Sequence, residues 1–182
     1  MSRGAPYTPG PAVGAEIDKD GERWTLVLVR QLRHPPERVW RALTEPAHLA
    51  AWAPFDADRS LATPGAVTLS TVGTPSPQVA EATVKRAEAP KLLEYDWGGR
   101  ELRWELEQVG EETRLTLWHH IDRGFIAWGA TGWHICFEVL ERLLAGEPIG
   151  RIAGPTALAL DGFKQLRADY ARLLGVASPD SP

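Results

Sequence analysis

The feature that most constrains the fold is a run of four segments in the middle of the chain in which apolar and polar residues alternate. In the segment ELRWELE, for example, Leu102, Trp104 and Leu106 fall on one face of an extended chain, and charged residues fall on the other. Very short connectors with Pro or Gly separate the segments, which is typical of β-hairpins. The pattern therefore predicts an antiparallel meander with one dry face. Its strands are expected at residues 78–88, 91–97, 100–109 and 113–121.

A helix that follows the meander is predicted to cover this dry face. Between Gly129 and Gly146, apolar residues recur at three- and four-residue steps, which places them on one side of a helix. Thr131 is a candidate N-cap, and Gly146 followed by Pro148 is a stop signal, so the helix is expected at residues 131–145. Its predicted dry side carries Trp133, Cys136, Phe137, Leu140, Leu143 and Leu144, and its predicted wet side carries His134, Glu138, Glu141 and Arg142.

The remaining elements follow from residue propensities and from the positions of proline. Residues 23–32 are rich in β-branched and apolar side chains and predict a first strand, which two short helices follow between Pro36 and Trp52. Residues 161–174 predict a final amphipathic helix. Further strands are expected at residues 55–61 and 66–72, and a loop is expected at 122–130, where Phe125, Ile126 and Trp128 would cover the gap between sheet and helix.

Composition and length indicate an ordinary globular protein, with 182 residues of which 43% are hydrophobic and 24% are charged. We expect one domain at residues 22–175, a flexible Pro/Gly-rich leader at 1–21 and a disordered tail at 176–182. The net charge of −4 and the lack of a basic stripe argue against a nucleic-acid partner. No segment resembles a signal peptide or a membrane span. Since Cys136 is the sole cysteine, no disulfide forms within the chain, and a cytoplasmic location is expected.

Three segments resemble a known family. They are HPPERVWRALTEPAHLAAW at residues 34–52, TRLTLWH at 113–119 and GWHICFEVLERLLAGE at 132–147. Together with the order of elements, they are similar to the SRPBCC or START-like helix-grip superfamily. Within it they resemble the bacterial branch of the activator of heat-shock-protein ATPase homologue family, which is often grouped with polyketide cyclases.

The resemblance covers about residues 24–175 and implies an α+β helix-grip fold of the START and birch-pollen-allergen type. In that fold a curved antiparallel sheet, here of about seven strands, wraps around a long C-terminal helix, and two short helices follow the first strand. The resemblance also implies a pocket between the sheet and the helix. The matching motifs are packing and turn features, so they carry no chemistry with them.

Eight tryptophans are an unusual number for a chain of this length, and all of them lie outside the predicted leader and tail. Those on the dry face have two readings, which the sequence leaves open. They form a plain core, or they line a cavity that stacks on a flat or oily molecule. On the second reading the candidate ligand-binding residues are Tyr95, Trp97, Trp104, Leu106, Leu117, His119, Trp128, Trp133 and Phe137.

No catalytic residue, metal site or cofactor is predicted. The five histidines lack the spacing of metal ligands, and alternation places the strand carboxylates on the wet face of the sheet. His119 differs, because alternation directs it to the dry side. It is then either a core histidine bonded to the backbone or a polar group that orients a ligand.

These observations favour a protein that binds a small hydrophobic or aromatic molecule without a defined catalytic activity. One alternative is a cyclase- or hydrolase-like enzyme that uses Tyr95 or His119 to transfer a proton. Another is a chaperone- or stress-related interaction module that acts through the wet face of the sheet. Trp118 lies on that wet face, where it would contact a second subunit in a homodimer.

Overall fold

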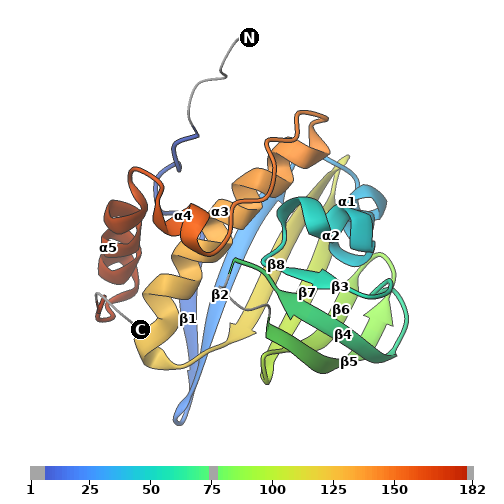
Figure 1. Ribbon diagram of the computed structural model, residues 1–182, viewed down its shortest axis with the longest axis horizontal. Coiled ribbons are helices and arrows are strands. Elements are labelled where there is room, and N and C mark those ends of the chain that lie inside the picture. The colour runs from blue at the N-terminus through green and yellow to red at the C-terminus, as the bar shows by residue number, and fades with distance from the viewer. Residues whose placement is uncertain (1–6, 74–77, 180–182) are drawn as a thin grey trace.

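The computed structural model describes residues 7–73 and 78–179, and in this part of the chain eight strands form one curled antiparallel sheet around the long helix α3 (Figure 1). This is the helix-grip architecture expected from the sequence, with one strand more than expected. The strands, in the order β1-β2-β8-β7-β6-β5-β4-β3 across the sheet, are β1 (Ala15–Asp20), β2 (Arg23–Leu32), β3 (Phe55–Ala57), β4 (Gly65–Thr71), β5 (Gln78–Glu88), β6 (Leu92–Trp97), β7 (Arg100–Val109) and β8 (Glu112–His120).

Five α-helices and one 3-10 helix complete the described fold. None of them is long and apolar enough to cross a membrane. In Figure 1, α3 runs diagonally between the sheet and the last helix, α5. The helices are α1 (Pro36–Thr44), α2 (Pro46–Trp52), the 3-10 helix η1 (Arg123–Phe125), α3 (Ile126–Leu144), α4 (Pro155–Leu158) and α5 (Phe163–Leu174).

The predicted meander is confirmed, and the sheet is extended by the first strands of the chain. β5 to β8 pair in sequence order, and β2 returns to pair with β8. In this register His119 of β8 has Leu26 of β2 on one side and Leu102 of β7 on the other. His119 therefore lies between two neighbouring strands near the end of β8, and its side chain meets Trp133 of α3 as alternation predicted.

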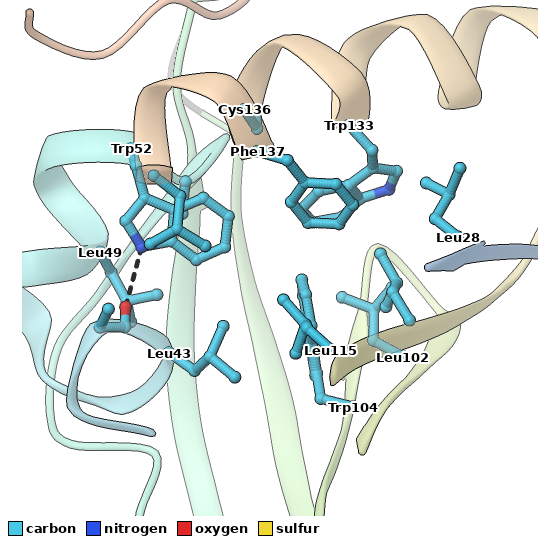
Figure 2. Close-up of a cluster of buried hydrophobic side chains, with 14 of the residues drawn as sticks. Leu28, Leu43, Leu49, Trp52, Leu102, Trp104, Leu115, Trp133, Cys136 and Phe137 are labelled. Carbon is cyan, nitrogen blue, oxygen red and sulfur yellow. Dashed lines mark hydrogen bonds between the residues drawn. The ribbon is translucent and has the colours of Figure 1, made fainter. Parts of the chain in front are cut away.

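The dry face of the sheet is confirmed by burial, and α3 covers it. Figure 2 shows Trp133, Cys136 and Phe137 on the side of α3 that faces the strands. Below them, Leu102, Trp104 and Leu115 come from β7 and β8 and are almost wholly buried. Helices α1 and α2 close one end of this core with Leu43, Leu49 and Trp52, and the indole N–H of Trp52 donates to the carbonyl of Ala42 at 2.8 Å (Figure 2).

Helix α3 begins earlier than predicted, so the prediction of a loop at residues 122–130 is wrong for its last five residues. Ile126 and Ala127 are fully buried in the first turn, and this burial outweighs the low helix propensity of Gly129 and Gly132. Thr131 is not the N-cap, because it lies inside the helix and its hydroxyl donates to the carbonyl of Ala127 at 2.7 Å.

The prediction that His134 lies on a wet face is also wrong, because a second layer covers the outer side of α3. The Nδ1 of His134 lies 2.7 Å from the hydroxyl of Tyr170 in α5, and its Nε2 lies 2.9 Å from a carboxylate oxygen of Glu138. Arg30 of β2 donates to the same Tyr170 hydroxyl at 3.0 Å. The backbone N–H of Gly10 donates to Glu138 at 2.9 Å, so residues before β1 cross over the helix as well.

Part of the predicted flexible leader is a strand. β1 pairs with β2 along its whole length, from Ala15 opposite Leu28 to Asp20 opposite Arg23. The adjoining Asp20-Gly21 pair, with Gly21 at φ +59°, is a hairpin signal that the Pro/Gly-rich composition obscured. Residues 1–6 of the leader and 180–182 of the predicted tail lie outside the described residues.

The strand predicted at residues 55–61 ends at Ala57, because the chain leaves the sheet there. Leu61 is fully buried, and its N–H donates to the carbonyl of Thr44 at the end of α1 at 2.9 Å. The bond to α1 replaces the ladder bond that a longer strand would have made. The other predicted strands and the final helix agree with the structure to within two residues at each end.

Two glycine backbones touch where the end of β4 meets the segment before α4. A Cβ on Gly154 would lie 2.4 Å from the carbonyl oxygen of Gly73, and one on Gly73 would lie 2.8 Å from the Cα of Gly154. Gly154 also has φ +57° and ψ −133°, a conformation that side chains other than glycine rarely adopt. This contact holds the segment before α4 against the sheet.

Gly154→Ala should therefore destabilise the protein. Strain at this φ and the clash with Gly73 together should lower the free energy of unfolding by about 2 kcal/mol or more. The measurement is urea unfolding followed by circular dichroism. Gly124→Ala is the control, because a Cβ there meets nothing within 4 Å, and it should change stability by less than about 0.5 kcal/mol. Equal stability of the two variants would contradict the described backbone contact.

Candidate ligand-binding site

Five of the nine predicted site residues form close-packed core instead of a cavity wall. Each is at most 4% exposed, and none lines the pocket described below. Within this group, the indole N–H of Trp104 donates to the hydroxyl of Tyr95 at 3.1 Å, so both polar groups are engaged with each other. The middle of the space between sheet and helix is therefore filled. The five residues are Tyr95, Trp104, Leu106, Leu117 and Phe137.

The other four predicted residues, Trp97, His119, Trp128 and Trp133, surround a pocket of about 250 Å³ at the N-terminal half of α3. It lies between that half of the helix, the ends of β6 and β8, and the segment that leads into α4. Besides those four, its lining comprises Pro54, Ile121, Phe125, Gly129, Gly132, Cys136, Ile152, Ala153, Gly154 and Ala157.

Two glycines of α3 line the pocket, and one of them, Gly132, leaves space open. A Cβ on Gly132 would meet nothing within 4 Å, so the missing side chain leaves open space. A Cβ on Gly129 would instead lie 2.8 Å from Cδ1 of Ile121, so that glycine permits close packing. Sequence reasoning missed both residues. Two glycines three apart inside an apolar helical pattern were the available signal.

The wall opposite α3 is held in place by Arg151. Its guanidinium donates to the carbonyl of Ala50 at the end of α2 at 2.8 Å and pairs with Asp56 of β3. The contact between Gly73 and Gly154 holds the same wall from the other end. Residues 150–154 therefore form a fixed side of the pocket, although they carry no regular secondary structure.

A second, more polar cavity of about 450 Å³ adjoins the first. Both are lined by Trp97, His119, Ile121 and Phe125. The second one adds polar side chains, among them an ion pair in which Arg100 donates from Nη1 to Asp122 at 2.9 Å. That hydrogen bond lowers the pKa of Asp122. An apolar pocket thus adjoins a cavity with a polar rim, formed by Thr71, Gln78, Arg100 and Asp122.

The indole N–H groups around the pocket are all engaged. Trp97 donates to the hydroxyl of Thr71 at 3.0 Å, and Trp128 donates to the carbonyl of Pro179 at 3.0 Å. Trp133 donates to Nδ1 of His119 at 2.9 Å. These residues present ring carbons to the pocket, so its walls are apolar. The remaining nitrogen of His119 is the exception.

His119 is neutral. Its side chain is only 5% exposed, and burial, with smaller contributions from Arg100 and His120, lowers its pKa from 6.5 to about 3. The indole of Trp133 can only donate, so Nδ1 of His119 accepts and the ring proton sits on Nε2. The ring also packs against Trp97, with centroids 5.9 Å apart.

The other candidate reactive groups are inert or already paired. Burial raises the pKa of the Cys136 thiol to about 12, which disfavours the reactive thiolate. On the outer face of the sheet, Glu94 lies 3.7 Å from Arg103, and the Arg103 guanidinium stacks over Trp118 at 5.5 Å. The described residues contain no group of three side chains suited to holding a metal ion.

The burial of neutral His119 should make stability depend on pH. Between pH 6.5 and about 3, the unfolded chain binds a proton at this ring that the folded protein does not, so stability falls as pH decreases. The contribution should approach about 1.4 kcal/mol per pH unit in this range and be constant above it. The measurement is the free energy of unfolding in urea at pH 4 to 8, for the wild type and for His119→Gln. Plotted against pH, the two free energies should have different slopes below pH 6.5 and equal slopes above it. Parallel curves throughout would show that the ring is not buried neutral.

Comparisons with known proteins agree with this fold. Residues 33–145 match the family described as Activator of Hsp90 ATPase homolog 1-like protein. No curated protein matches the chain. Among solved structures it is similar to EF2215 from Enterococcus faecalis, a conserved protein of unknown function, with 18% identity, a TM-score of 0.67, and coverage of 87% of this chain and 89% of that one.

Two further solved structures are similar over almost the whole chain. The protein encoded by gene BPP1335 from Bordetella parapertussis is 26% identical, with a TM-score of 0.63 and 96% of each chain covered. CalU16 from Micromonospora echinospora is 20% identical, with a TM-score of 0.61 and coverage of 92% of this chain and 98% of that one. Since the matched residues span more than half of the sequence and the helix-grip fold agrees, the chain belongs to the Activator of Hsp90 ATPase homolog 1-like family.

Proposed function

We propose that the protein binds a small, flat, largely apolar molecule in the pocket beside Gly132. The observation that carries the proposal is an open space of about 250 Å³ whose tryptophan N–H groups are all engaged elsewhere, so that ring carbons face it. The helix-grip fold of the family is of a ligand-binding type, which supports the same conclusion.

The physical driving force would be the removal of apolar surface from water. A pocket lined by indole rings and aliphatic side chains leaves that surface hydrated when it is empty. A ligand that fills it gains roughly 25 cal/mol for each Å² of apolar surface buried on either side. Trp97, Trp128 and Trp133 offer faces and edges on which an aromatic ligand stacks.

The size of the pocket limits the ligand. Its volume of about 250 Å³ is slightly below the roughly 300–1,000 Å³ of sites for drug-sized molecules. A ligand with one or two fused rings fits this description. A longer molecule would extend past Trp97 and His119 into the adjoining cavity of about 450 Å³, where polar groups would meet the rim.

Binding is better supported than the catalytic alternative. Tyr95 is enclosed in the core with its hydroxyl bonded to Trp104, so it does not reach the pocket. His119 has its basic nitrogen occupied by the indole of Trp133 and is neutral, so it is a poor proton acceptor. The interaction-module alternative, which rests on Trp118 and the outer sheet face, stays a prediction.

Gly132→Leu tests the proposal, because the new side chain should fill the pocket. Leucine has a higher helix propensity than glycine, so the thermal midpoint should stay the same or rise while binding weakens at least tenfold. The probes are 2-acetylnaphthalene and 2-isopropylnaphthalene, with affinity measured by isothermal titration calorimetry.

The matched control is Lys164→Leu, which adds the same side chain at an exposed position of α5 away from the pocket. It should bind both probes like the wild type. Indole N–H signals in NMR spectra should shift most for the tryptophans of the pocket when a probe is added. The proposal fails if neither probe binds, or if Gly132→Leu binds them as tightly as the wild type does.

A further inference from the structure

We infer that the ligand of this pocket carries a carbonyl-type hydrogen-bond acceptor, and that Trp133 sets this requirement by fixing His119 as a donor. The inference rests on the proposed binding function and adds the chemical class of the ligand to it. Three observations carry it: the bond between the two side chains, the free nitrogen of His119, and the absence of acceptor side chains in the lining.

The bond between Trp133 and His119 determines where the imidazole proton lies. An indole nitrogen has a proton and no lone pair available for hydrogen bonding, so at 2.9 Å it can only donate to Nδ1. A neutral imidazole carries one proton, which must then be on Nε2. Burial keeps the ring neutral, because it lowers the pKa of His119 to about 3. His119 is therefore held as an Nε2–H donor.

That Nε2–H group is available to a ligand. It makes no hydrogen bond with any residue that the structure describes, and it remains accessible to solvent. The side chain is almost wholly buried, yet it lines both the apolar pocket and the adjoining cavity. A ligand that displaces water from this place must supply an acceptor, or it leaves the donor unpaired.

The side chains in the rest of the lining offer almost no acceptor to a ligand that donates. None of the residues that line the apolar pocket has a carboxylate, amide or hydroxyl side chain. A ligand amine or hydroxyl proton directed into the pocket would therefore find no side-chain partner apart from the weakly accepting thiol of Cys136. The matching ligand has an apolar ring system and one carbonyl oxygen, as in an aromatic ketone, aldehyde, ester or quinone.

Two probes of similar size separate this requirement from simple burial. 2-Acetylnaphthalene has a carbonyl group where 2-isopropylnaphthalene has a CH group that carries a methyl, and the hydrocarbon is the more hydrophobic of the two. Burial alone therefore ranks the hydrocarbon first. Pairing with His119 reverses the order, and we expect the ketone to bind at least tenfold more tightly in calorimetry.

Trp133→Phe tests the role assigned to the indole, because it keeps an aromatic ring and removes the N–H. Without that donor the proton of His119 is free to move to Nδ1, and the preference for the ketone should fall to threefold or less. Trp104→Phe is the matched control. It removes another buried indole N–H from the same aromatic cluster, one that donates to Tyr95 and not to His119, and it should retain the preference.

Nitrogen NMR of the His119 ring provides a measurement that needs no variant. In the wild type, Nε2 should show the shift of a protonated nitrogen and Nδ1 that of an unprotonated acceptor, and the ketone should move the Nε2 signal. The opposite tautomer would overturn the inference directly.

The outcomes also separate this inference from the proposed function. If neither probe binds, the proposed function fails and the inference fails with it. Suppose instead that both probes bind and that Gly132→Leu blocks both. If the hydrocarbon then binds at least as tightly as the ketone, the inference is overturned while the proposed function stands. A full ketone preference in Trp133→Phe would overturn the role of Trp133.

Discussion

The packing of Trp133 is the interaction on which the rest of the structure depends. Its ring points from α3 into the sheet and meets aromatic side chains from four other elements, at centroid distances of 5.4 to 6.5 Å. The same ring donates the hydrogen bond that orients His119. Its position fixes both how deeply α3 sits in the sheet and which side of the helix remains open. The partners are Trp52 of α2, Trp97 of β6, Trp104 of β7 and His119 of β8.

Large rings fill one half of the space under α3, and the missing side chain of Gly132 leaves part of the other half open. Trp104 and Phe137 occupy the centre, where the sheet and helix lie against each other without a gap. Toward the N-terminal end of α3, Gly132 presents bare backbone instead. Aromatic residues therefore form close-packed core in one part of this interface and line a pocket in another. That a ligand stacks in the pocket is the proposal made above. Residue type alone does not separate core from lining, because tryptophan serves both purposes.

The sequence predicted the fold in most of its parts because alternation and short connectors constrain an antiparallel meander strongly. It also predicted that His119 faces inward. What it could not predict depends on tertiary contacts. His134 reads as polar surface on a helical wheel, and its burial depends on its contacts with Tyr170 of α5 and with Glu138. The first turns of α3 read as a loop because Gly129 and Gly132 have low helix propensity, which the burial of Ile126 and Ala127 outweighs. The pocket depends on where a side chain is missing, which no pattern of apolar residues encodes.

The pairing of β2 with β8 has a consequence for how the chain reaches its native state. These neighbours come from opposite ends of the sheet-forming sequence, so the whole meander must be present before the two can meet. Helix α3 follows β8, so the element that covers the core emerges only after the whole sheet-forming sequence. Until then the dry face of the hairpins is exposed to neighbouring chains. Contacts between distant parts of a chain also slow folding. The nascent protein should therefore be most vulnerable to aggregation in the interval between synthesis of the hairpins and arrival of the helix.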